Sequence, residues 1–426
     1  MVEHDRRLSR LAREAAAHRW SRREILRRGA ALGLSASALA GVVRGTAAQE
    51  ATPAATGPVM VSILNREMTF DEIKAEIERE GEVTVGNWTY TANDALVRRF
   101  QEHVQEVYGV EVTLNYQASQ QPSTYLTNLY TSLQAGDPAP YDVLAIEENY
   151  WAEARSQPEV VMEDFLPSGL IPNADRVLDL FKRAPTAIGF QASATPGIVY
   201  NRATAGYMKD WTDLADERLR GKLLMWLPGD ITSGGVLLGL AAALGKDYQN
   251  LDQMKETIDF AVDQIGPNAI KYTTDFSEVQ QLFSSGVVDV VTFWNSLARL
   301  QFLNGQEDAA FLVAASGQYA ANGYMWIPKG PRHPVLAQIF INWRLSDDVQ
   351  FPSDAWNIER GAWAELHEGL LGPSYEPLIP EWFKADYYSY YPTIEQLQTQ
   401  YKVVDWDYYT ANSRSWFDYY EERLGL

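Results

Sequence analysis

Apolar and polar residues alternate with two different periods from residue 82 onward. Short β-favouring runs predict three strands, at 83–88 (VTVGNW), 110–116 (VEVTLNY) and 141–146 (YDVLAI). Between them, apolar residues recur at helical spacing and predict helices over 92–107 and 125–133. The run at 141–146 is almost continuously apolar, which is typical of a strand covered on both faces. Because strands and helices alternate, the pattern predicts an α/β fold with a mostly parallel sheet.

The same alternation resumes after residue 195 and predicts a second set of elements. We expect strands at 196–200 (PGIVY), 222–226 (KLLMW) and 287–294 (VVDVVTFW). We expect helices at 235–244, near 250–262 and at 334–345, followed by an aromatic C-terminal segment. A chain of this length exceeds what one core usually supports, so we expect two lobes.

A helix with a clear beginning precedes the first strand. Residues 69–72 (TFDE) form a capping-box pattern, Ile73 and Ile77 lie one turn apart, and Gly81 is placed to end the helix at Glu80. Residues 49–59 (QEATPAATGPV), which lie ahead of it, have the composition of a linker.

The first 48 residues have the order of a cleavable secretion signal. An arginine-rich leader precedes the uncharged residues 29–43, and small residues follow around a cleavage point after Ala48. The uncharged run of about 15 residues is shorter than the roughly 20 that a membrane helix needs. Residues 21–27 (SRREILR) resemble the twin-arginine signal. We therefore expect export through the twin-arginine machinery; the alternatives are a soluble N-terminal helix and a retained signal anchor.

Composition indicates a soluble, acidic product. The chain has no cysteine, so neither a disulfide nor a lipid-modified cysteine can form. Its formal net charge is −20; removing residues 1–48 takes away ten of the 36 basic and four of the 56 acidic residues, which leaves −26. Such a charge disfavours nucleic acid and anionic lipid as partners and mildly favours cationic ligands.

No catalytic or metal-binding motif stands out after residue 48. Three histidines remain, far apart in sequence, at His103, His333 and His367. There is no Gly-x-Ser-x-Gly motif and no glycine-rich phosphate-binding loop. Carboxylates are numerous, so their count alone does not exclude an acid–base pair of a hydrolase. We predict that the protein is not an enzyme and needs no cofactor.

Aromatic residues gather where predicted strands end. Aromatic residues make up 12% of the chain. Rings stand beside polar side chains at 87–91 (NWTYT), 147–151 (EENYW) and 293–296 (FWNS). Ligands of open α/β sheets bind outside the carboxyl ends of the strands, and rings offer apolar walls and π faces for cations. Three such clusters predict a shared ligand-binding cleft; the alternative for each ring is a place at the edge of the core.

Several of these segments together resemble the spermidine/putrescine-binding proteins, within the type II class of solute-binding proteins of ATP-driven importers. The resemblance covers the chain from about residue 82 to the C-terminus. It is carried in order by 85–90 (VGNWTY), 116–150, 196–202 (PGIVYNR), 210–214 (DWTDL), 220–224 (RGKLL), 293–296 (FWNS), 324–328 (YMWIP) and 405–424.

The resemblance implies a periplasmic-binding-protein-like type II fold with two α/β lobes, each discontinuous in sequence. Its chain crossings would lie near Thr195 and Asn322. The first lobe would comprise 82–195 with 322–365, and the second 196–321 with 366–426. The resemblance also implies a ligand between the lobes and a membrane permease as partner. Residues 1–48 would be the signal, and 49–81 the linker with its short helix.

The resemblance also implies which residues contact the ligand. The first lobe would contribute Trp88, Thr89, Tyr90, Glu147 and Asn149. The second lobe would contribute Trp294 and Asp230, and Asn322 would contact the ligand from the return crossing.

The chain departs from the family pattern at two acidic positions. After the strand at 223–226, where the family has carboxylates, Leu227-Pro228 stand closest and Asp230 is displaced. Before the return crossing, residues 321–323 (ANG) replace an aromatic residue and an aspartate. Glu147 and Glu148 are candidates to replace the missing charge, with a solvated loop as the alternative. We expect a polyamine or related amine as ligand; the rival functions are carbohydrate binding for an importer and a secreted carboxylate-dependent hydrolase.

Overall fold

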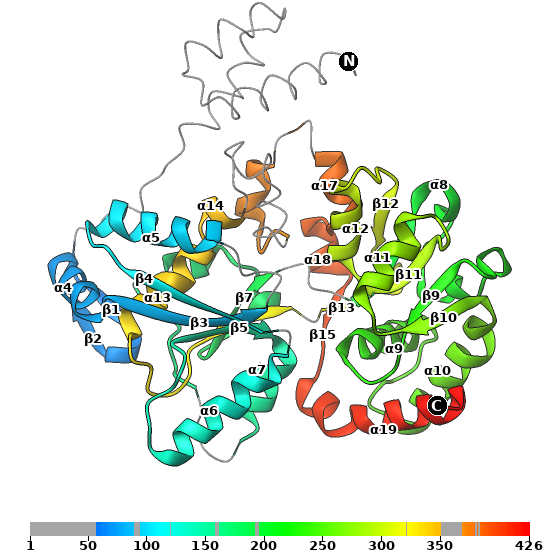
Figure 1. The fold of residues 1–426 in the computed structure, drawn as a ribbon, viewed down its shortest axis with the longest axis horizontal. Helices are drawn as coiled ribbons and strands as arrows, with labels where there is room; N and C mark the ends of the chain where they lie inside the picture. The colour runs from blue at the N-terminus through cyan, green and yellow to red at the C-terminus, as the bar shows by residue number, and fades with distance from the viewer. Residues whose placement is uncertain are drawn as a thin grey trace, which may run out of the picture.

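The protein forms two α/β bodies that lie side by side (Figure 1). The computed structural model describes residues 57–88, 94–119, 121–157, 162–191, 196–320, 322–350, 369–379, 381 and 384–426. The predicted secretion signal and twin-arginine segment lie outside the described residues. We call the body that contains the first sheet the first lobe, and the body that contains the second sheet the second lobe.

The first lobe is built on a six-stranded sheet with the order β4-β3-β5-β14-β7-β6. Its strands are β3 (Glu82–Trp88), β4 (Thr113–Ser119), β5 (Val143–Glu147), β6 (Lys182–Arg183), β7 (Ala187–Gln191) and β14 (Gly323–Trp326). One face carries α5 (Asp94–Tyr108) and α13 (Pro334–Arg344), and the other carries α6 (Ser123–Ala135) and α7 (Glu148–Arg155).

The second lobe is built on a five-stranded sheet with the order β10-β9-β11-β8-β12. Its strands are β8 (Pro196–Asn201), β9 (Leu223–Trp226), β10 (Ala269–Thr273), β11 (Val290–Trp294) and β12 (Ala309–Leu312). One face carries α11 (Phe276–Ser284) and α12 (Asn295–Leu303), and the other carries α9 (Ile231–Ala243), α10 (Leu251–Phe260) and α19 (Trp406–Leu424).

The two sheets share one arrangement. In the first, β3 pairs in parallel with β4 and β5, and β14 runs antiparallel between β5 and β7. In the second, β9 pairs in parallel with β10 and β11, and β8 runs antiparallel between β11 and β12. In each sheet the strand that arrives from the other lobe, β14 or β8, runs antiparallel to both of its neighbours, and the two-residue β6 is also antiparallel to β7. The predicted α/β class is confirmed.

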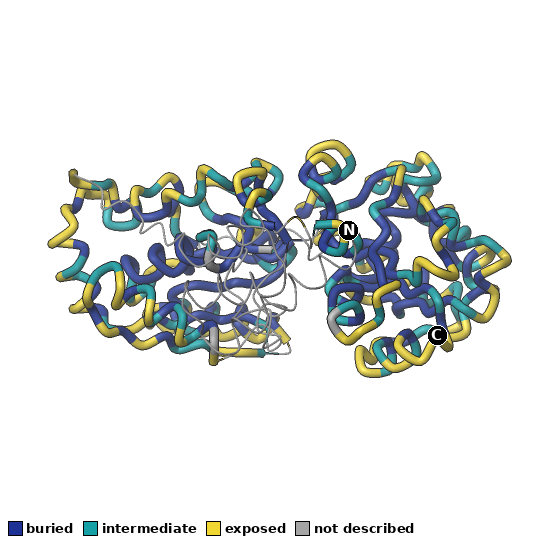
Figure 2. Tube along the Cα trace, turned by 90° about the horizontal axis from the view of Figure 1, so that it is seen from above, coloured by how far each residue is buried: buried dark blue, intermediate teal, exposed yellow. Residues whose placement is uncertain are grey.

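Central strands are buried on both faces. In β5, Val143 and Ala145 belong to the core on one face of the sheet, and Leu144 and Ile146 belong to the core on the other. Figure 2 shows buried residues running through the interior of each lobe. Helices on both faces therefore account for the continuous apolar run of this strand.

The segment that precedes the first sheet in sequence is hydrogen-bonded to the chain that returns from the second lobe. Helix α4 (Phe70–Glu80) has the predicted capping box at Thr69 and ends at Gly81 with φ 67°, so both of its predicted ends are confirmed. The buried Glu80 carboxylate accepts hydrogen bonds from the backbone N–H groups of Val335 and Leu336, which begin α13. This contact holds α13, which follows the second lobe in sequence, on the first lobe.

Shorter elements connect these layers. They are β1 (Val59–Val61), η1 (Ser62–Leu64), β2 (Arg66–Met68), η3 (Pro172–Arg176), η4 (Asp179–Phe181), α8 (Arg202–Ala205), η5 (Trp211–Ala215), η6 (Glu217–Leu219), the π-helical turn η7 (Ala261–Ile265), η8 (Gly266–Asn268), β13 (Gln318–Ala320), α14 (Asp347–Gln350), η9 (Pro373–Leu378), α17 (Lys384–Tyr390), α18 (Ile394–Thr399) and β15 (Tyr401–Val403). Strands β13 and β15 pair in parallel, and in Figure 1 they lie between the two lobes.

Two segments near the C-terminus pack on different lobes. The N–H of Leu178 donates to the carbonyl of Leu371, and the Tyr375 hydroxyl donates to the carbonyl of Leu345. Residues 369–379 therefore pack on the first lobe, whereas α17 packs on β12 and α12 of the second.

Candidate ligand-binding site

Two predicted site residues stand where the chain crosses between the lobes. Glu147, the last residue of β5, pairs with Gly323, directly after the return crossing. Trp294, the last residue of β11, pairs with Pro196, the first residue of β8 and of the second lobe. The carboxyl ends of both sheets therefore reach the junction of the two lobes, where open α/β sheets place ligands.

The end of β3 is held by hydrogen bonds that fix its last residues. Asn87 is fully buried, and its side chain donates to the Tyr116 hydroxyl at 2.6 Å and accepts from the N–H of Trp88 at 2.7 Å. Tyr125 of α6 donates to the carbonyl of Asn87 at 2.7 Å. Trp88 is half-buried. The predicted contacts Thr89 and Tyr90 lie outside the described residues.

Both glutamates that follow β5 are buried, so the solvated-loop alternative is wrong. Glu147 is 5% exposed and stands at the N-cap position of α7. Glu148 is fully buried, and its carboxylate lies 2.5 Å from Nε of Arg183. Burial raises the pKa of Glu148 to about 7, although Arg183 opposes this rise. Because its carboxylate is paired with Arg183, Glu148 is a structural ion-pair partner within the first lobe.

The first turn of α9 fixes two tryptophans of the second lobe. Nε1 of Trp226 donates to the Asp230 carboxylate at 2.9 Å, and Nε1 of Trp294 donates to the Thr232 hydroxyl at 2.9 Å. The other Asp230 oxygen accepts from the backbone N–H groups of Thr232 and Ser233. Asp230, predicted as a counter-charge, is therefore the N-cap of α9 and already accepts three hydrogen bonds. Capping explains why α9 begins at Ile231, earlier than the helix predicted from residue 235.

Tyr150 links the two predicted counter-charges. Burial raises the pKa of its hydroxyl, and the nearby carboxylates of Glu147, Glu153 and Asp230 raise it further. Because Glu147 belongs to the first lobe and Asp230 to the second, the lobes bring both carboxylates within electrostatic reach of one phenol. The sequence pointed to Tyr150 only as a member of its aromatic cluster.

Several buried polar atoms at this junction have no hydrogen-bond partner among the residues that the structure describes. They are Asn149 Oδ1, both amide atoms of Asn295, Gln318 Oε1 and Tyr409 Oη. Asn149 was predicted as a contact, and Asn295 lay inside a predicted cluster. Gln318 and Tyr409 were missed, and no local pattern marks them. Asn322 is fully buried, and its carbonyl accepts from the N–H of Glu148 at 2.9 Å.

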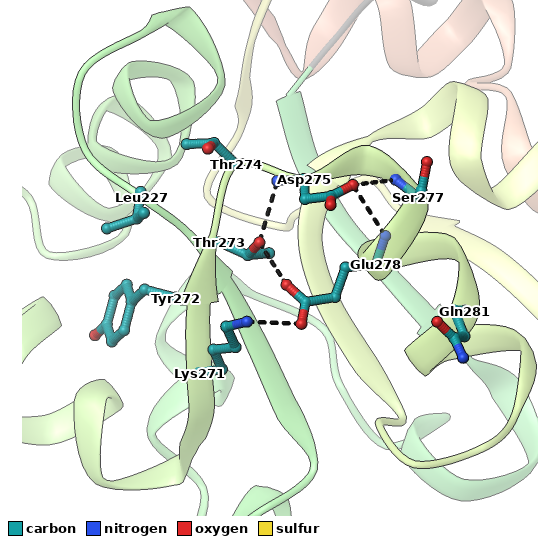
Figure 3. Close-up of a pocket in the computed structure, with 9 residues that line it drawn as sticks. All are labelled: Leu227, Lys271, Tyr272, Thr273, Thr274, Asp275, Ser277, Glu278 and Gln281. Atoms are coloured by element: carbon teal, nitrogen blue, oxygen red, sulfur yellow. Dashed lines mark hydrogen bonds and ion pairs between the residues drawn. The ribbon is translucent and has the colours of Figure 1, made fainter.

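Two hollows lie on the described surface, one on the second lobe and one between the lobes. One, of about 600 Å³, lies on the second lobe at the end of β10 and the start of α11, and its lining includes Leu227 and Thr273 (Figure 3). Its Glu278 accepts from Lys271 and Thr273, and no predicted site residue lines it. The other, of about 540 Å³, lies between α7 and α19, where Arg155 of the first lobe pairs with Asp407 of the second.

Within the described residues there is no cluster of three or more histidine, aspartate or glutamate side chains able to hold a metal ion. The described helices likewise include none with the length and apolar character needed to cross a bilayer.

Two α/β lobes, joined by crossings beside a buried carboxylate and two tryptophans, define a two-lobed binding protein. The family model for bacterial extracellular solute-binding proteins matches residues 90–351, and the chain belongs to that family. No curated protein sequence matches the chain.

Solved structures share this fold over most of the chain. A protein of Bordetella parapertussis, described as an extracellular solute-binding protein, superposes with a TM-score of 0.62 at 18% identity and covers 81% of this chain and 99% of its own. The spermidine/putrescine transporter substrate-binding protein of Streptococcus pneumoniae gives 0.61 at 18% identity, with coverages of 80% and 99%. A GABA receptor gives 0.59 at 16% identity, with coverages of 80% and 97%.

These comparisons confirm the predicted type II fold and the solute-binding class. The chain is an extracellular solute-binding protein, and its family implies a small-molecule ligand and a membrane permease as partner. Members of the family are binding proteins, so this chain is not an enzyme.

Proposed function

We propose that the protein binds a polyamine or a related amine between its lobes and delivers it to the permease of an ATP-driven importer. The observation that carries this proposal is Glu147, a carboxylate that is 5% exposed and stands beside the return crossing. Trp88, Asn149, Asp230, Trp294 and Asn322 are the further proposed contacts among the described residues. Thr89 and Tyr90 complete the set.

The energetics of a buried cation support this choice. An ammonium group that enters a closed cleft loses several kcal/mol of hydration, which a carboxylate and ring faces must offset. Glu147 supplies the charge. The N–H groups of Trp226 and Trp294 are bonded to α9, which fixes the orientation of both rings.

The missing acids favour an amine of low charge. Residues 321–323 contain no carboxylate, Glu148 is paired with Arg183, and Asp230 caps α9. A long polyamine with several ammonium groups would leave part of its charge without a partner. A monoamine or short diamine would need fewer carboxylate partners.

Binding is tested by thermal shift and calorimetry with the purified protein. The probes are putrescine, spermidine, 4-aminobutanoate and the neutral sugars glucose and maltose. A ligand that binds only the native state raises the melting temperature, and we expect this for an amine. A rise in melting temperature with a sugar and none with any amine would support the carbohydrate-binding alternative. The aromatic ring faces and the buried amides at the junction would also suit a sugar.

We propose further that the protein reaches the cell exterior through the twin-arginine machinery. Residues 21–27 supply the signal pattern. Changing both Arg22 and Arg23 to lysine should leave the precursor inside the cell, which fractionation and immunoblotting would show. Normal export of this double variant would point to the general secretion route.

A further inference from the structure

Two buried side-chain amides of the second lobe have atoms without a hydrogen-bond partner among the described residues. Asn295, the first residue of α12, is fully buried, and neither atom of its amide has a hydrogen-bond partner within the described residues. Gln318 of β13 is also fully buried. Its Nε2 donates to the carbonyl of Pro196 at 2.6 Å, while its Oε1 has no partner in the same described part of the chain.

The start of β8 brings these groups together. Pro196 is bonded to Gln318 and pairs in the sheet with Trp294, the residue before Asn295. Helix α9 packs closely on the same proline, because a Cβ added at Gly235 would lie 2.7 Å from its ring.

The neighbouring glycine of α9 brings a phenol to the same region. A Cβ added at Gly234 would lie 2.1 Å from the Tyr409 hydroxyl, so that hydroxyl rests on the helix backbone. Tyr409 is buried, and its hydroxyl has no hydrogen-bond partner among the described residues. Two consecutive glycines thus permit the approach of Pro196 on one side and Tyr409 on the other.

Unpaired polar atoms of this kind call for a partner from outside the chain. A buried donor or acceptor without a hydrogen bond is costly, and native proteins contain few of them. Here Asn295 follows Trp294, which pairs with Pro196, and Gln318 is bonded to that same proline. Tyr409 touches Gly234, which precedes the glycine that packs on Pro196.

We propose that Asn295, Gln318 and Tyr409 form a polar subsite that receives an uncharged hydroxyl or carboxamide group of the ligand. The inference rests on the proposed function, because Glu147 on the other lobe would hold the amine. The ligand class is therefore an amine that carries a hydroxyl or carboxamide at its far end. Such a group both donates and accepts hydrogen bonds, as the Asn295 amide does. An ammonium only donates and would leave Asn295 Nδ2 unpaired, whereas a carboxylate only accepts and would leave the oxygens of Asn295 and Gln318 unpaired.

The test is calorimetric titration with four probes that share a four-carbon amine. They are 4-aminobutanamide, 4-amino-1-butanol, 1,4-diaminobutane (putrescine) and 4-aminobutanoate. We expect the amide and the alcohol to bind at least about tenfold more tightly than the diamine and the carboxylate. Asn295→Leu should remove this preference and change the Kd of the diamine by less than about threefold.

The stability of the variant without ligand gives a second readout. Because the Asn295 side chain makes no hydrogen bond to any described residue, Asn295→Leu should leave the melting temperature unchanged or raise it. The matched control is Asn268→Leu in the same lobe. Asn268 is buried and donates to the carbonyls of Leu214 and Asp216 at 2.9 Å, so its loss should lower the melting temperature.

Three outcomes would overturn the inference. They are a wild-type preference for the diamine or the carboxylate, an equal loss of affinity for all four probes in Asn295→Leu, and destabilisation of both Asn295→Leu and the smaller Asn295→Ala as large as that of Asn268→Leu. The last outcome would mean that an internal water binds the amide. A different result would contradict the proposed function itself. In that case Glu147→Gln would leave the affinity for every amine unchanged.

Discussion

The two lobes place different kinds of side chain at the junction between them. The edge of the first lobe presents Glu147, a buried carboxylate. The edge of the second presents Trp226 and Trp294, whose N–H groups are held by the first turn of α9. Asp230 also lies on the second lobe, but it accepts three hydrogen bonds from that lobe. One lobe therefore contributes charge, and the other contributes oriented rings.

This division shows how little a residue type alone reveals about its role. Glu147 and Glu148 are adjacent in sequence, yet Glu148 is neutralised by Arg183 and Glu147 stands at the crossing. Asp230 suits a cation by its charge, but its bonds identify it first as a helix cap. The surroundings of each carboxylate decide whether it can serve a ligand.

The largest contrast is expected between a junction tryptophan and a core tryptophan. Trp294→Ala should weaken amine binding by about 100-fold in calorimetry, because it removes a ring face from the ligand. Its cost in unfolding free energy should be small, on the order of 1–2 kcal/mol, because the ring is half-buried and makes one hydrogen bond.

The matched control for this variant is Trp211→Ala. Trp211 is fully buried, and its Nε1 donates to the carbonyl of Gly317 at 3.1 Å. Its truncation should cost about 3–5 kcal/mol of stability in urea unfolding. If Trp294→Ala costs as much as Trp211→Ala, the ring of Trp294 belongs to the core and the site is misplaced.

A second contrast concerns pH, through a buried carboxyl group of the first lobe. Burial raises the pKa of Glu80 to about 7, although the N–H groups of Leu336 and Val335 oppose the rise. Because the folded state binds this proton more tightly than the unfolded state, the contribution of Glu80 to stability falls as pH rises from about 5 to 8. Relative to wild type, Glu80→Gln should gain on the order of 1–2 kcal/mol between pH 5 and pH 8.

Urea unfolding of both proteins at the two pH values measures this difference. The comparison with wild type is needed because burial lowers the pKa of His103 to about 4, which makes the protein less stable as pH falls. Glu78→Gln, on the exposed side of the same helix, serves as the control and should follow wild type. A Glu80→Gln difference that stays constant from pH 5 to pH 8 would contradict the prediction.

A third contrast separates the two predicted counter-charges. Glu147→Gln should weaken amine binding by about tenfold or more, and added salt should weaken wild-type binding moderately. Asp230→Asn should have a smaller effect on affinity and little on stability, because asparagine also caps helices well. Calorimetry with 1,4-diaminobutane at two salt concentrations checks both. Equal losses in the two variants would show that the lobes share the charge.

Strong local patterns predicted most of the framework. The capping box and Gly81 predicted both ends of α4, and the continuous apolar run predicted β5. Strands β10 and β12, which form the two edges of the second sheet, were not predicted. Helix α7 was missed because it begins directly after β5, with Glu147 as its N-cap residue.

The site was predictable only in part, because its contacts join distant segments. Rings at strand ends led to Trp88 and Trp294. The pairing of Glu148 with Arg183, however, spans 35 residues, and Gln318 and Tyr409 reach the junction from β13 and α19. No spacing along the chain encodes such contacts. They depend on how the sheets and helices pack once both lobes have formed.

The smallest effect is expected from the ion pair that joins the lobes. Arg155 of α7 and Asp407 of α19 lie 2.5 Å apart, with side chains that are 46% and 66% exposed. An exposed ion pair contributes little to the free energy of unfolding. This pair, however, forms only while the two lobes are in contact, so it favours the arrangement in which they would enclose a ligand. Arg155→Ala or Asp407→Ala should therefore weaken amine binding about two- to fivefold, chiefly through faster dissociation.

The charge-swapped double variant, Arg155→Asp with Asp407→Arg, should recover most of this affinity. High salt should reduce the difference between wild type and the single variants, because it screens exposed charges. Lys246→Ala is the control, since Lys246 pairs with Glu256 inside the second lobe and its loss leaves the contact between lobes intact. Stopped-flow dissociation rates distinguish the cases: if Lys246→Ala speeds release as much as Arg155→Ala, the effect comes from net charge and the pair does not hold the lobes together.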